Sequence, residues 1–275
     1  MIRKVILITL VFSILNPTAG APNPGKSENN RQNMAFIPSG EYLMGSIKSL
    51  KEHDPTAFLN PDRHMLGPDN KAHKVFVDDF YIDLYETRNA DYATFINSKD
   101  VKAAGFKKPR FWDHPDFNDP LQPVVGVSWK EARAFCLWNN KRLPTEAEWE
   151  KASRGKRPIA FPWGDEAPDS KKLNYHSEIG KTVKVGSYEE GKSDYGVYDL
   201  SGNVSEWVFD WHDADFYQFS PKKNPKGPSK GKYKVIRGGN WRNISDDVRL
   251  AYRGATVPKI RNKTVGFRCA KDPPH

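Results

Sequence analysis

Residues 238–254, GGNWRNISDDVRLAYRG, gather amide, carboxylate, guanidinium and aromatic side chains in one short stretch. The stretch contains no cysteine and no histidine, so it offers neither a thiolate nor an imidazole for nucleophilic or soft-metal chemistry. Asp247 is a candidate acid or base, although an aspartate in a loop more often caps the backbone or faces solvent. The other polar side chains suit adaptable hydrogen bonding to a partner.

A second stretch, YDLSGNVSEW at residues 198–207, supplies oxygen ligands. Asp199, Asn203 and Glu206 are separated mostly by small residues, and a tight turn at Gly202 would add backbone carbonyls. Mixed side-chain and carbonyl oxygens suit Ca²⁺, so the sequence predicts a structural calcium site. The alternative is that Asn203 stabilises the turn and Glu206 pairs with an arginine.

The chain has only two cysteines, Cys136 and Cys269. In an oxidising compartment the simplest interpretation is a single disulfide that closes a very long loop. The alternative, a metal site, is disfavoured because two lone cysteines without nearby histidines make a poor ligand set.

The N-terminus has the pattern of a secretory signal peptide over residues 1–21. Arg3 and Lys4 precede an apolar run at residues 5–15, and Ala19-Gly20-Ala21 form a cleavage motif. We expect an exported protein, periplasmic or secreted, with a flexible leader at residues 22–32. The alternative is an uncleaved anchor, but the run is shorter than the roughly 20 residues of a membrane helix, so we expect no membrane attachment after cleavage.

The formal net charge is +9. Much of the excess lies in SPKKNPKGPSKGKYK at residues 220–234, whose proline and glycine content indicates a solvated loop. A docking patch is the less favoured interpretation, because no aromatic residues interleave with these lysines. We therefore do not expect nucleic acid as a partner.

The elements that must position these groups can be placed along the chain. The residues around Ser39-Gly40 predict a hairpin, and residues 73–86 predict a strand. Three helices are expected: one capped by Thr87 and running to about residue 96, one capped by Ser128 and ending at residues 139–140, and one that begins with a capping box of Thr145 and Glu148 and stops at residue 155.

The second half of the chain alternates short strand signals with glycines and large aromatic residues. Trp163, Trp207, Trp211 and Trp241 lie among these glycines, where their rings can fill a core that has little regular structure. We therefore expect one α+β domain over residues 33–272.

Several segments in fixed order resemble the formylglycine-generating enzyme family, also called the sulfatase-modifying factor family. They are FIPSGEYLMGS, FYIDLYETRNADYATFIN, PVVGVSWKEARAFCLW, KRLPTEAEWEKASRG, FPWGDE, YGVYDLSGNVSEWVFDW, VIRGGNW and VGFRCAKD. The resemblance implies a fold related to C-type lectins with little regular secondary structure. It also implies a disulfide between Cys136 and Cys269.

Enzymes of this family use two active-site cysteines that bind copper(I) and operate on dioxygen. The resemblance puts Asn243 and Val248 at those two positions, and neither side chain is a soft ligand for Cu(I). Asn240 and Asp247 stand where family members commonly have hydroxyl side chains. We therefore do not expect copper-dependent formylglycine formation.

The family's structural calcium site carries over as Asp199, Ser201, Asn203 and Glu206. A second family site would use Asn174 and the carbonyl of Tyr175, but the loop that holds its partner aspartate is shortened here. Calcium is thus the expected metal.

Two functions remain open. The leading hypothesis is an accessory or binding protein whose partner, an unknown protein or small molecule, contacts the surface from Asn240 to Lys263. That surface includes Trp241, Arg242, Asn243, Asp246, Asp247, Arg249, Tyr252, Arg253, Arg261 and Asn262. The alternative hypothesis is an oxidoreductase with different chemistry in a pocket formed by Trp207, Asn240, Asn243, Asp247 and Arg253.

Overall fold

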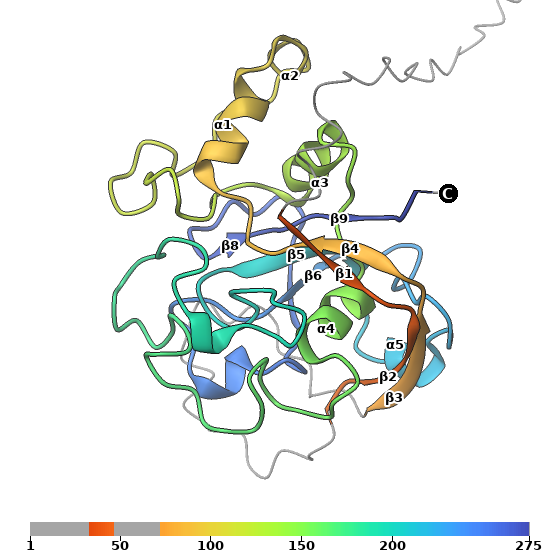
Figure 1. The fold of residues 1–275 in the computed structure, drawn as a ribbon. Helices are drawn as coiled ribbons and strands as arrows, with labels where there is room; N and C mark the ends of the chain where they lie inside the picture. The colour runs from red at the N-terminus through yellow and green to blue at the C-terminus, as the bar shows by residue number, and fades with distance from the viewer. Residues whose placement is uncertain (1–32, 47–71, 275) are drawn as a thin grey trace, which may run out of the picture. The chain divides into compact units, whose positions relative to one another are not determined.

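The first four strands form two antiparallel ladders between the segments 34–44 and 73–83. In the computed structural model, which describes residues 33–46 and 72–274, β1 (Met34–Ile37) pairs with β4 (Phe80–Asp83), and β2 (Gly40–Met44) pairs with β3 (His73–Val77) (Figure 1). The hairpin predicted around residues 39–40 is therefore wrong, because β1 and β2 do not pair with each other. The strand predicted at residues 73–86 is two strands, interrupted at Asp78 and Asp79.

The three predicted helices are present, with one different start. α1 (Asn89–Asn97) begins after Arg88, whose guanidinium binds Asp91 in the first turn, rather than after Thr87. Thr87 is buried and donates its N–H to the carbonyl of Phe267, so it belongs to the strand-like connection before the helix. A short helix, α2 (Lys99–Ala103), follows.

The other two helices start where the sequence predicts. α3 (Trp129–Trp138) begins at Ser128, whose hydroxyl accepts a hydrogen bond from the N–H of Glu131. α4 (Glu146–Arg154) begins with the predicted capping box of Thr145 and Glu148, and it ends at Gly155, where φ is +62°. Every residue of α4 is buried, so this helix lies inside the domain.

A four-stranded sheet in the order β7-β6-β5-β8 dominates the second half of the described chain. β5 (Ser205–Trp211) pairs antiparallel with β6 (Lys234–Arg237) and parallel with β8 (Val265–Gly266), while β7 (Gly254–Thr256) pairs with β6. β9 (Ala270–Lys271) extends the first sheet beside β4. The remaining elements are short: the helical turns η2 (Glu189–Gly191) and η3 (Ser245–Val248) and the helix α5 (Phe216–Phe219). The predicted α+β class with few regular elements is confirmed.

The core contains two large clusters of buried side chains. One surrounds Trp149 of α4, and the other packs Tyr92, Phe135 and Trp207 around α1 and α3. Trp207 and Trp241 are buried as predicted, whereas Trp163 and Trp211 are only half-buried.

The predicted disulfide joins Cys136 of α3 to Cys269, which immediately precedes β9. The S–S distance is 2.01 Å and the Cα–Cα distance is 5.6 Å. Both cysteines are fully buried in the second core cluster, so the bond ties the C-terminal segment to α3.

The predicted signal peptide (1–21) and leader (22–32) lie outside the described residues. None of the helices in the described ranges combines the length and the apolar character that a bilayer crossing requires.

Candidate functional site

Two glycines after β6 fold the chain back on itself. Gly238 and Gly239 have φ values of +90° and +68°, which L side chains rarely adopt. A Cβ atom on Gly239 would lie 2.7 Å from the carbonyl oxygen of Asp247 and 2.8 Å from Cγ1 of Val248. The glycine therefore lets the start of the segment pack directly against η3.

This fold brings Asn240, Asn243 and Asp247 into one hydrogen-bonded cluster. The backbone N–H of Asn240 donates to Oδ1 of Asn243 at 3.0 Å, and Nδ2 of Asn243 donates to Oδ2 of Asp247 at 2.9 Å. Nδ2 of Asn240 donates to the hydroxyl of Ser205 at 3.1 Å. All four residues are buried, so their polar groups satisfy one another rather than face solvent.

Asn243 and Val248, the two positions where the resemblance predicts copper-binding cysteines, offer no soft ligand here. The Asn243 amide is engaged by Asp247 and by the backbone of Asn240. Val248 is fully buried against Phe161 and Leu173. Both cysteines of the chain are consumed by the disulfide, so no thiolate is left, and these residues do not fit a Cu(I) centre.

The other two residues of the predicted pocket have different partners. Nε1 of Trp207 donates to the carbonyl of Val127 at 3.1 Å, within the core beside α3. The guanidinium of Arg253 binds Glu146 of α4 at 2.7 and 2.9 Å and lies 4.3 Å from the centre of the Tyr217 ring. Three of the five predicted residues thus form one hydrogen-bonded cluster, whereas Trp207 and Arg253 make their contacts elsewhere.

The predicted binding surface from Asn240 to Lys263 is exposed only in part. Asp246 is exposed, and the half-buried members are Arg242, Arg249, Tyr252, Arg261 and Asn262. Trp241, Asn243, Asp247 and Arg253 are buried, so these four predicted members of the surface do not lie on it.

Two of the four predicted calcium ligands, Asn203 and Glu206, use their side-chain oxygens within the protein. Both carboxylate oxygens of Glu206 accept from Arg268 at 2.7 Å, and one also accepts from Nε1 of Trp149. Oδ1 of Asn203 accepts from the N–H of Val183 at 3.0 Å. These contacts match the alternative in which an asparagine stabilises the turn and a glutamate pairs with an arginine.

The remaining predicted ligands are also buried. Oδ2 of Asp199 accepts from the N–H of Gly186 at 2.7 Å, and the Ser201 hydroxyl donates to the carbonyl of Val248. The carbonyl of Tyr175 accepts from the N–H of Glu178. Within the described part of the chain no group of three or more histidine, cysteine, aspartate or glutamate residues forms a metal-binding cluster.

Buried negative charge nevertheless accumulates around Asp199. Burial raises the pKa of Glu86 well above its usual value, and the nearby Asp199 and Glu206 raise it further. Burial also raises the pKa of Asp199 to about 6, and Glu206 adds to the increase. Arg268 is the buried cation that opposes these three carboxylates.

Asn174 adds an oxygen to this region. Its Nδ2 donates to Oδ1 of Asn203 at 3.3 Å, while its buried Oδ1 has no hydrogen-bond partner among the described residues. An amide oxygen beside excess carboxylates is the donor chemistry that Ca²⁺ takes. The donor types in this region, buried carboxylates and an amide oxygen, fit calcium, but Glu206 is held by Arg268 and Trp149 as it lies.

Sequence reasoning missed a buried ionic network along α4. Glu146 binds Arg253, Glu150 binds Arg237, and all four side chains are almost completely buried. Burial raises the pKa of Glu146, but Arg253 and Arg237 outweigh this effect, so the net pKa is lowered. The available signal was the spacing of four residues between the two glutamates in EAEWEKASR, which puts both on one face of the helix.

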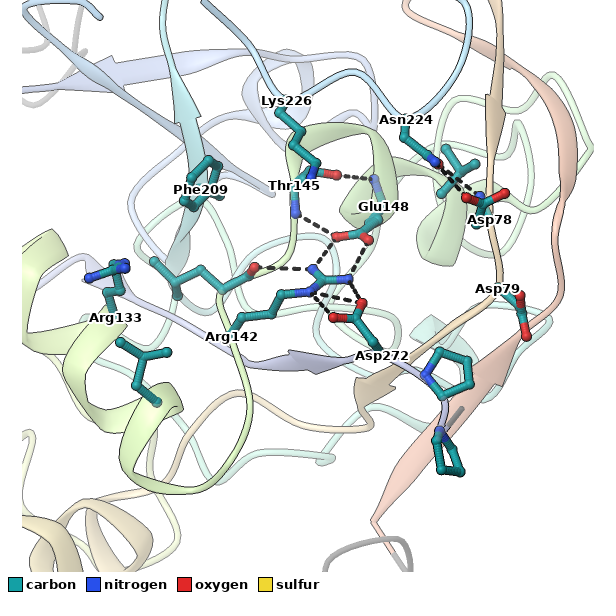
Figure 2. A pocket seen from close by; sticks show the side chains of 15 residues that line it. Asp78, Asp79, Arg133, Arg142, Thr145, Glu148, Phe209, Asn224, Lys226 and Asp272 are labelled. Atoms are coloured by element: carbon teal, nitrogen blue, oxygen red, sulfur yellow. Dashed lines mark hydrogen bonds and ion pairs between the residues drawn. The ribbon is translucent and has the colours of Figure 1, made fainter. Parts of the chain in front are cut away.

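Sequence reasoning also missed a cavity of about 760 Å³ next to α3 and α4 (Figure 2). Arg142 lies in its wall, where it binds Glu148 with two hydrogen bonds of 2.7 Å and Asp272 at 2.6 Å. The residues that line the cavity are Val77, Asp78, Asp79, Arg133, Leu137, Arg142, Leu143, Thr145, Glu148, Phe209, Asn224, Lys226, Asp272, Pro273 and Pro274. None of them belongs to the Asn240–Lys263 segment.

Comparison with known proteins extends over almost the whole chain. The family model "Sulfatase-modifying factor enzyme 1-like domain" matches residues 20–273. A serine/threonine-protein kinase pkn1 of Chlamydia caviae is 33% identical over 260 residues, 86% of this chain, but the match spans only 38% of the kinase's length. The formylglycine-generating enzyme of Bos taurus is 30% identical over 311 residues, covering 92% of this chain and 79% of that enzyme.

The fold has a counterpart among solved structures. PvdO from Pseudomonas aeruginosa superposes with a TM-score of 0.66 at 25% identity, covering 87% of this chain and 94% of PvdO. The resemblance drawn from the ordered sequence segments is confirmed. The chain belongs to the sulfatase-modifying factor family and has the formylglycine-generating enzyme fold, which is related to that of C-type lectins.

Proposed function

We propose that this protein is an exported member of the family that acts as an accessory or binding protein and does not generate formylglycine with copper. The observation that carries the proposal is the pair Asn243 and Val248, an amide and a hydrocarbon at the copper-ligand positions, in a chain whose only two cysteines form a disulfide. Copper(I) is held by soft thiolate ligands, and no thiolate is left to hold it.

The partner-binding role is assigned to the outer part of the Asn240–Lys263 segment. Arg242 lies 5.7 Å from the centre of the Trp241 ring, and the half-buried Tyr252 and Arg261 supply aromatic and charged contact area. Side chains of these types are enriched in protein interfaces. The buried asparagine and aspartate cluster also fixes the backbone of this surface at Arg242, whose N–H donates to Oδ1 of Asn240 at 3.1 Å.

An oxidoreductase is the second candidate, and the buried carboxylate of Asp247 favours it. A buried carboxylate that is hydrogen-bonded to the Asn243 amide is a group that can take a proton from, or give one to, a bound substrate. Arg253 and Trp207 are not part of this candidate catalytic site, because Arg253 binds Glu146 and the indole N–H of Trp207 donates to the carbonyl of Val127.

Metal analysis of the purified mature protein separates the two functions. The accessory function predicts no stoichiometric copper or iron. Stoichiometric iron or copper would support the oxidoreductase and contradict the accessory function. N-terminal sequencing of the protein from the producing cell tests export, with Pro22 as the expected first residue.

We also propose structural calcium beside Asp199, in the region of the predicted ligands Asp199, Ser201, Asn203 and Glu206. Support comes from three buried carboxylates, Glu86, Asp199 and Glu206, that are opposed by the single buried guanidinium of Arg268. The ion would offset buried negative charge and stabilise the folded state by mass action.

A further inference from the structure

The segment that connects α5 to β6 carries a concentration of positive charge. Residues 216–245 contain no aspartate and no glutamate. Five lysine side chains of this segment are exposed to solvent: Lys222, Lys223, Lys226, Lys230 and Lys232. These cations are therefore not balanced from within their own segment.

Acidic residues of neighbouring segments neutralise this charge only in part. Lys223 pairs with Asp78 at 3.2 Å, whereas none of the other four lysines forms an ion pair within residues 33–46 and 72–274. The segments that flank α5 and β3 contain three further carboxylates, those of Asp79, Asp213 and Asp215. With the exposed Lys74 of β3, five unpaired lysines face these three carboxylates, which leaves a surplus of two positive charges.

Hydrogen bonds fix the first half of the segment to β3. The N–H of Phe76 donates to the carbonyl of Lys222 at 2.7 Å, and the N–H of Asn224 donates to the carbonyl of Phe76 at 2.8 Å. The side chain of Asn224 also binds Asp78, as Figure 2 shows. Nζ of Lys223 lies 5.5 Å from the centre of the Phe76 ring. The first lysines therefore project from a backbone that is already ordered.

Two glycines hold the second half of the segment against β5. A Cβ atom on Gly227 would lie 2.9 Å from Cβ of Asp210, and one on Gly231 would lie 3.1 Å from Cβ of Trp211. The exposed lysines at 226, 230 and 232 are the immediate neighbours of these glycines. The backbone thus contacts β5 while the lysine side chains face solvent, and a backbone fixed in advance loses less entropy on binding.

An exposed aromatic ring precedes the lysines. Phe219, the last residue of α5, is 62% exposed and is the most exposed large apolar side chain among the residues that the structure describes. Only Ser220 and Pro221 separate it from Lys222. A soluble polyanion offers such a ring no apolar phase, whereas the boundary between lipid headgroups and acyl chains does.

We propose that the lysine loop, residues 219–232, binds the surface of an anionic lipid bilayer. Phe219 inserts at the headgroup boundary, and the exposed lysines pair with lipid phosphates. Basic side chains beside an apolar one are the combination by which peripheral proteins associate with anionic membranes. The sequence pattern favours a solvated loop, but the exposure of Phe219 and the fixed backbone favour a binding surface. The lysine loop shares no residue with the Asn240–Lys263 segment, so the proposal does not rest on the accessory function.

Cosedimentation with unilamellar vesicles tests the proposal on the mature protein, which begins at Pro22 and lacks the apolar run at residues 5–15. One set of vesicles contains phosphatidylglycerol and phosphatidylcholine in equal parts, and the other contains phosphatidylcholine alone. We expect at least about 100-fold tighter binding to the first set, since each lysine near an anionic surface contributes roughly fivefold. Raising the salt concentration should weaken this binding, because counterions screen the attraction.

Charge-reversal variants locate the binding surface. Lys226→Glu with Lys230→Glu should weaken binding to the phosphatidylglycerol vesicles about 25-fold or more, since two contacts of roughly fivefold each are lost. Lys102→Glu with Lys107→Glu changes the net charge equally at exposed positions in and after α2, well away from α5 (Figure 1). This control should change the affinity by less than about threefold, because distant charges are screened.

An aromatic variant tests the contribution of the exposed ring. Phe219→Ser should weaken binding to the phosphatidylglycerol vesicles about fivefold, the effect of burying part of a phenylalanine ring. Phe36→Ser removes another exposed ring, 49% exposed on β1, and should leave the binding unchanged. Circular dichroism melts establish that each variant is folded. The lysine and phenylalanine variants act through different chemistry, so the failure of one to fold leaves the other as a test.

Three results would overturn the proposal. One is equal sedimentation with the two sets of vesicles, and another is equal binding by the two double charge-reversal variants. The third is binding of a soluble anionic polysaccharide, such as alginate, without binding of the phosphatidylglycerol vesicles, which would assign the lysine loop a soluble polyanion instead of a membrane. The accessory function is tested separately by the metal analysis, so its failure there would leave these binding results unaffected.

Discussion

The side-chain amide of Asn243 donates a 2.9 Å hydrogen bond to the buried carboxylate of Asp247. The pair occupies the place where the family's copper enzymes are expected to have a cysteine and a neighbouring polar side chain. Both groups are buried, so the hydrogen bond between them satisfies polar atoms that water does not reach. The stretch from 238 to 254 thus uses its polar side chains first to hold its own fold, and only its outer residues are available to a ligand.

Removing the Asn243 amide should destabilise the folded protein. Asn243→Ala leaves the Asp247 carboxylate buried without its amide donor, so we expect the free energy of unfolding to fall by about 2–3 kcal/mol. Urea denaturation measures the change. The exposed Asn97→Ala is the matched control, with an expected change within about 0.5 kcal/mol. Equal effects of the two substitutions would show that the buried pair is unimportant.

The disulfide should make a large contribution to stability. Its loop spans 133 residues, for which the chain-entropy model gives roughly 5 kcal/mol of stabilisation. Replacing both cysteines with serine should lower the melting temperature strongly, as calorimetry can measure. Thiol titration of the denatured, unreduced protein should find no reactive thiol, and two thiols would contradict the bond.

Asp199 should make stability depend on pH when calcium is absent. Its folded pKa is about 6, above the ordinary value of 3.8, so the folded state binds the proton more tightly. The resulting stabilisation is complete below about pH 4 and is lost as the pH rises through about 6, a change of roughly 3 kcal/mol. Urea denaturation in chelator from pH 4 to 7 should show this loss in the wild type and a smaller one in Asp199→Asn. If the free energies of unfolding of the wild type and of Asp199→Asn changed with pH in the same way, Asp199 would not be the source of the pH dependence.

Calcium should act on the same residue. Excess calcium is expected to raise the melting temperature relative to chelator in the wild type, and to have a weaker effect on Asp199→Asn, because the ion binds the folded state. Magnesium at the same ionic strength controls for screening. An unchanged melting temperature in calcium and chelator would contradict the calcium proposal.

Sequence patterns predicted the helices well because their signals are local. Ser128 and Thr145 cap their helices through contacts three residues away, so the amino-acid types suffice. The hairpin at residues 39–40 failed because strand pairing is decided by distant partners, here the segment 73–83. Thr87 was misplaced for a similar reason, since its N–H bonds to Phe267 across the fold.

In the candidate site, too, contacts between residues close in sequence could be predicted, whereas contacts between distant residues could not. Asn240, Asn243 and Asp247 are close in sequence, and their grouping could be anticipated. Arg253 instead meets Glu146, 107 residues away, and no local pattern specifies that ion pair. The cavity beside Phe209 is built from five separate segments, so only the folded chain reveals it.

The central claim is that this domain cannot use copper to oxidise a cysteine, and one measurement tests it most directly. The purified mature protein is incubated with copper(I), dioxygen and a cysteine peptide derived from a sulfatase, and the peptide is analysed by mass spectrometry. The account predicts that no formylglycine peptide forms beyond the level of a reaction without protein, because Asn243 and Val248 supply no thiolate. Protein-dependent conversion of the cysteine to the aldehyde would contradict it.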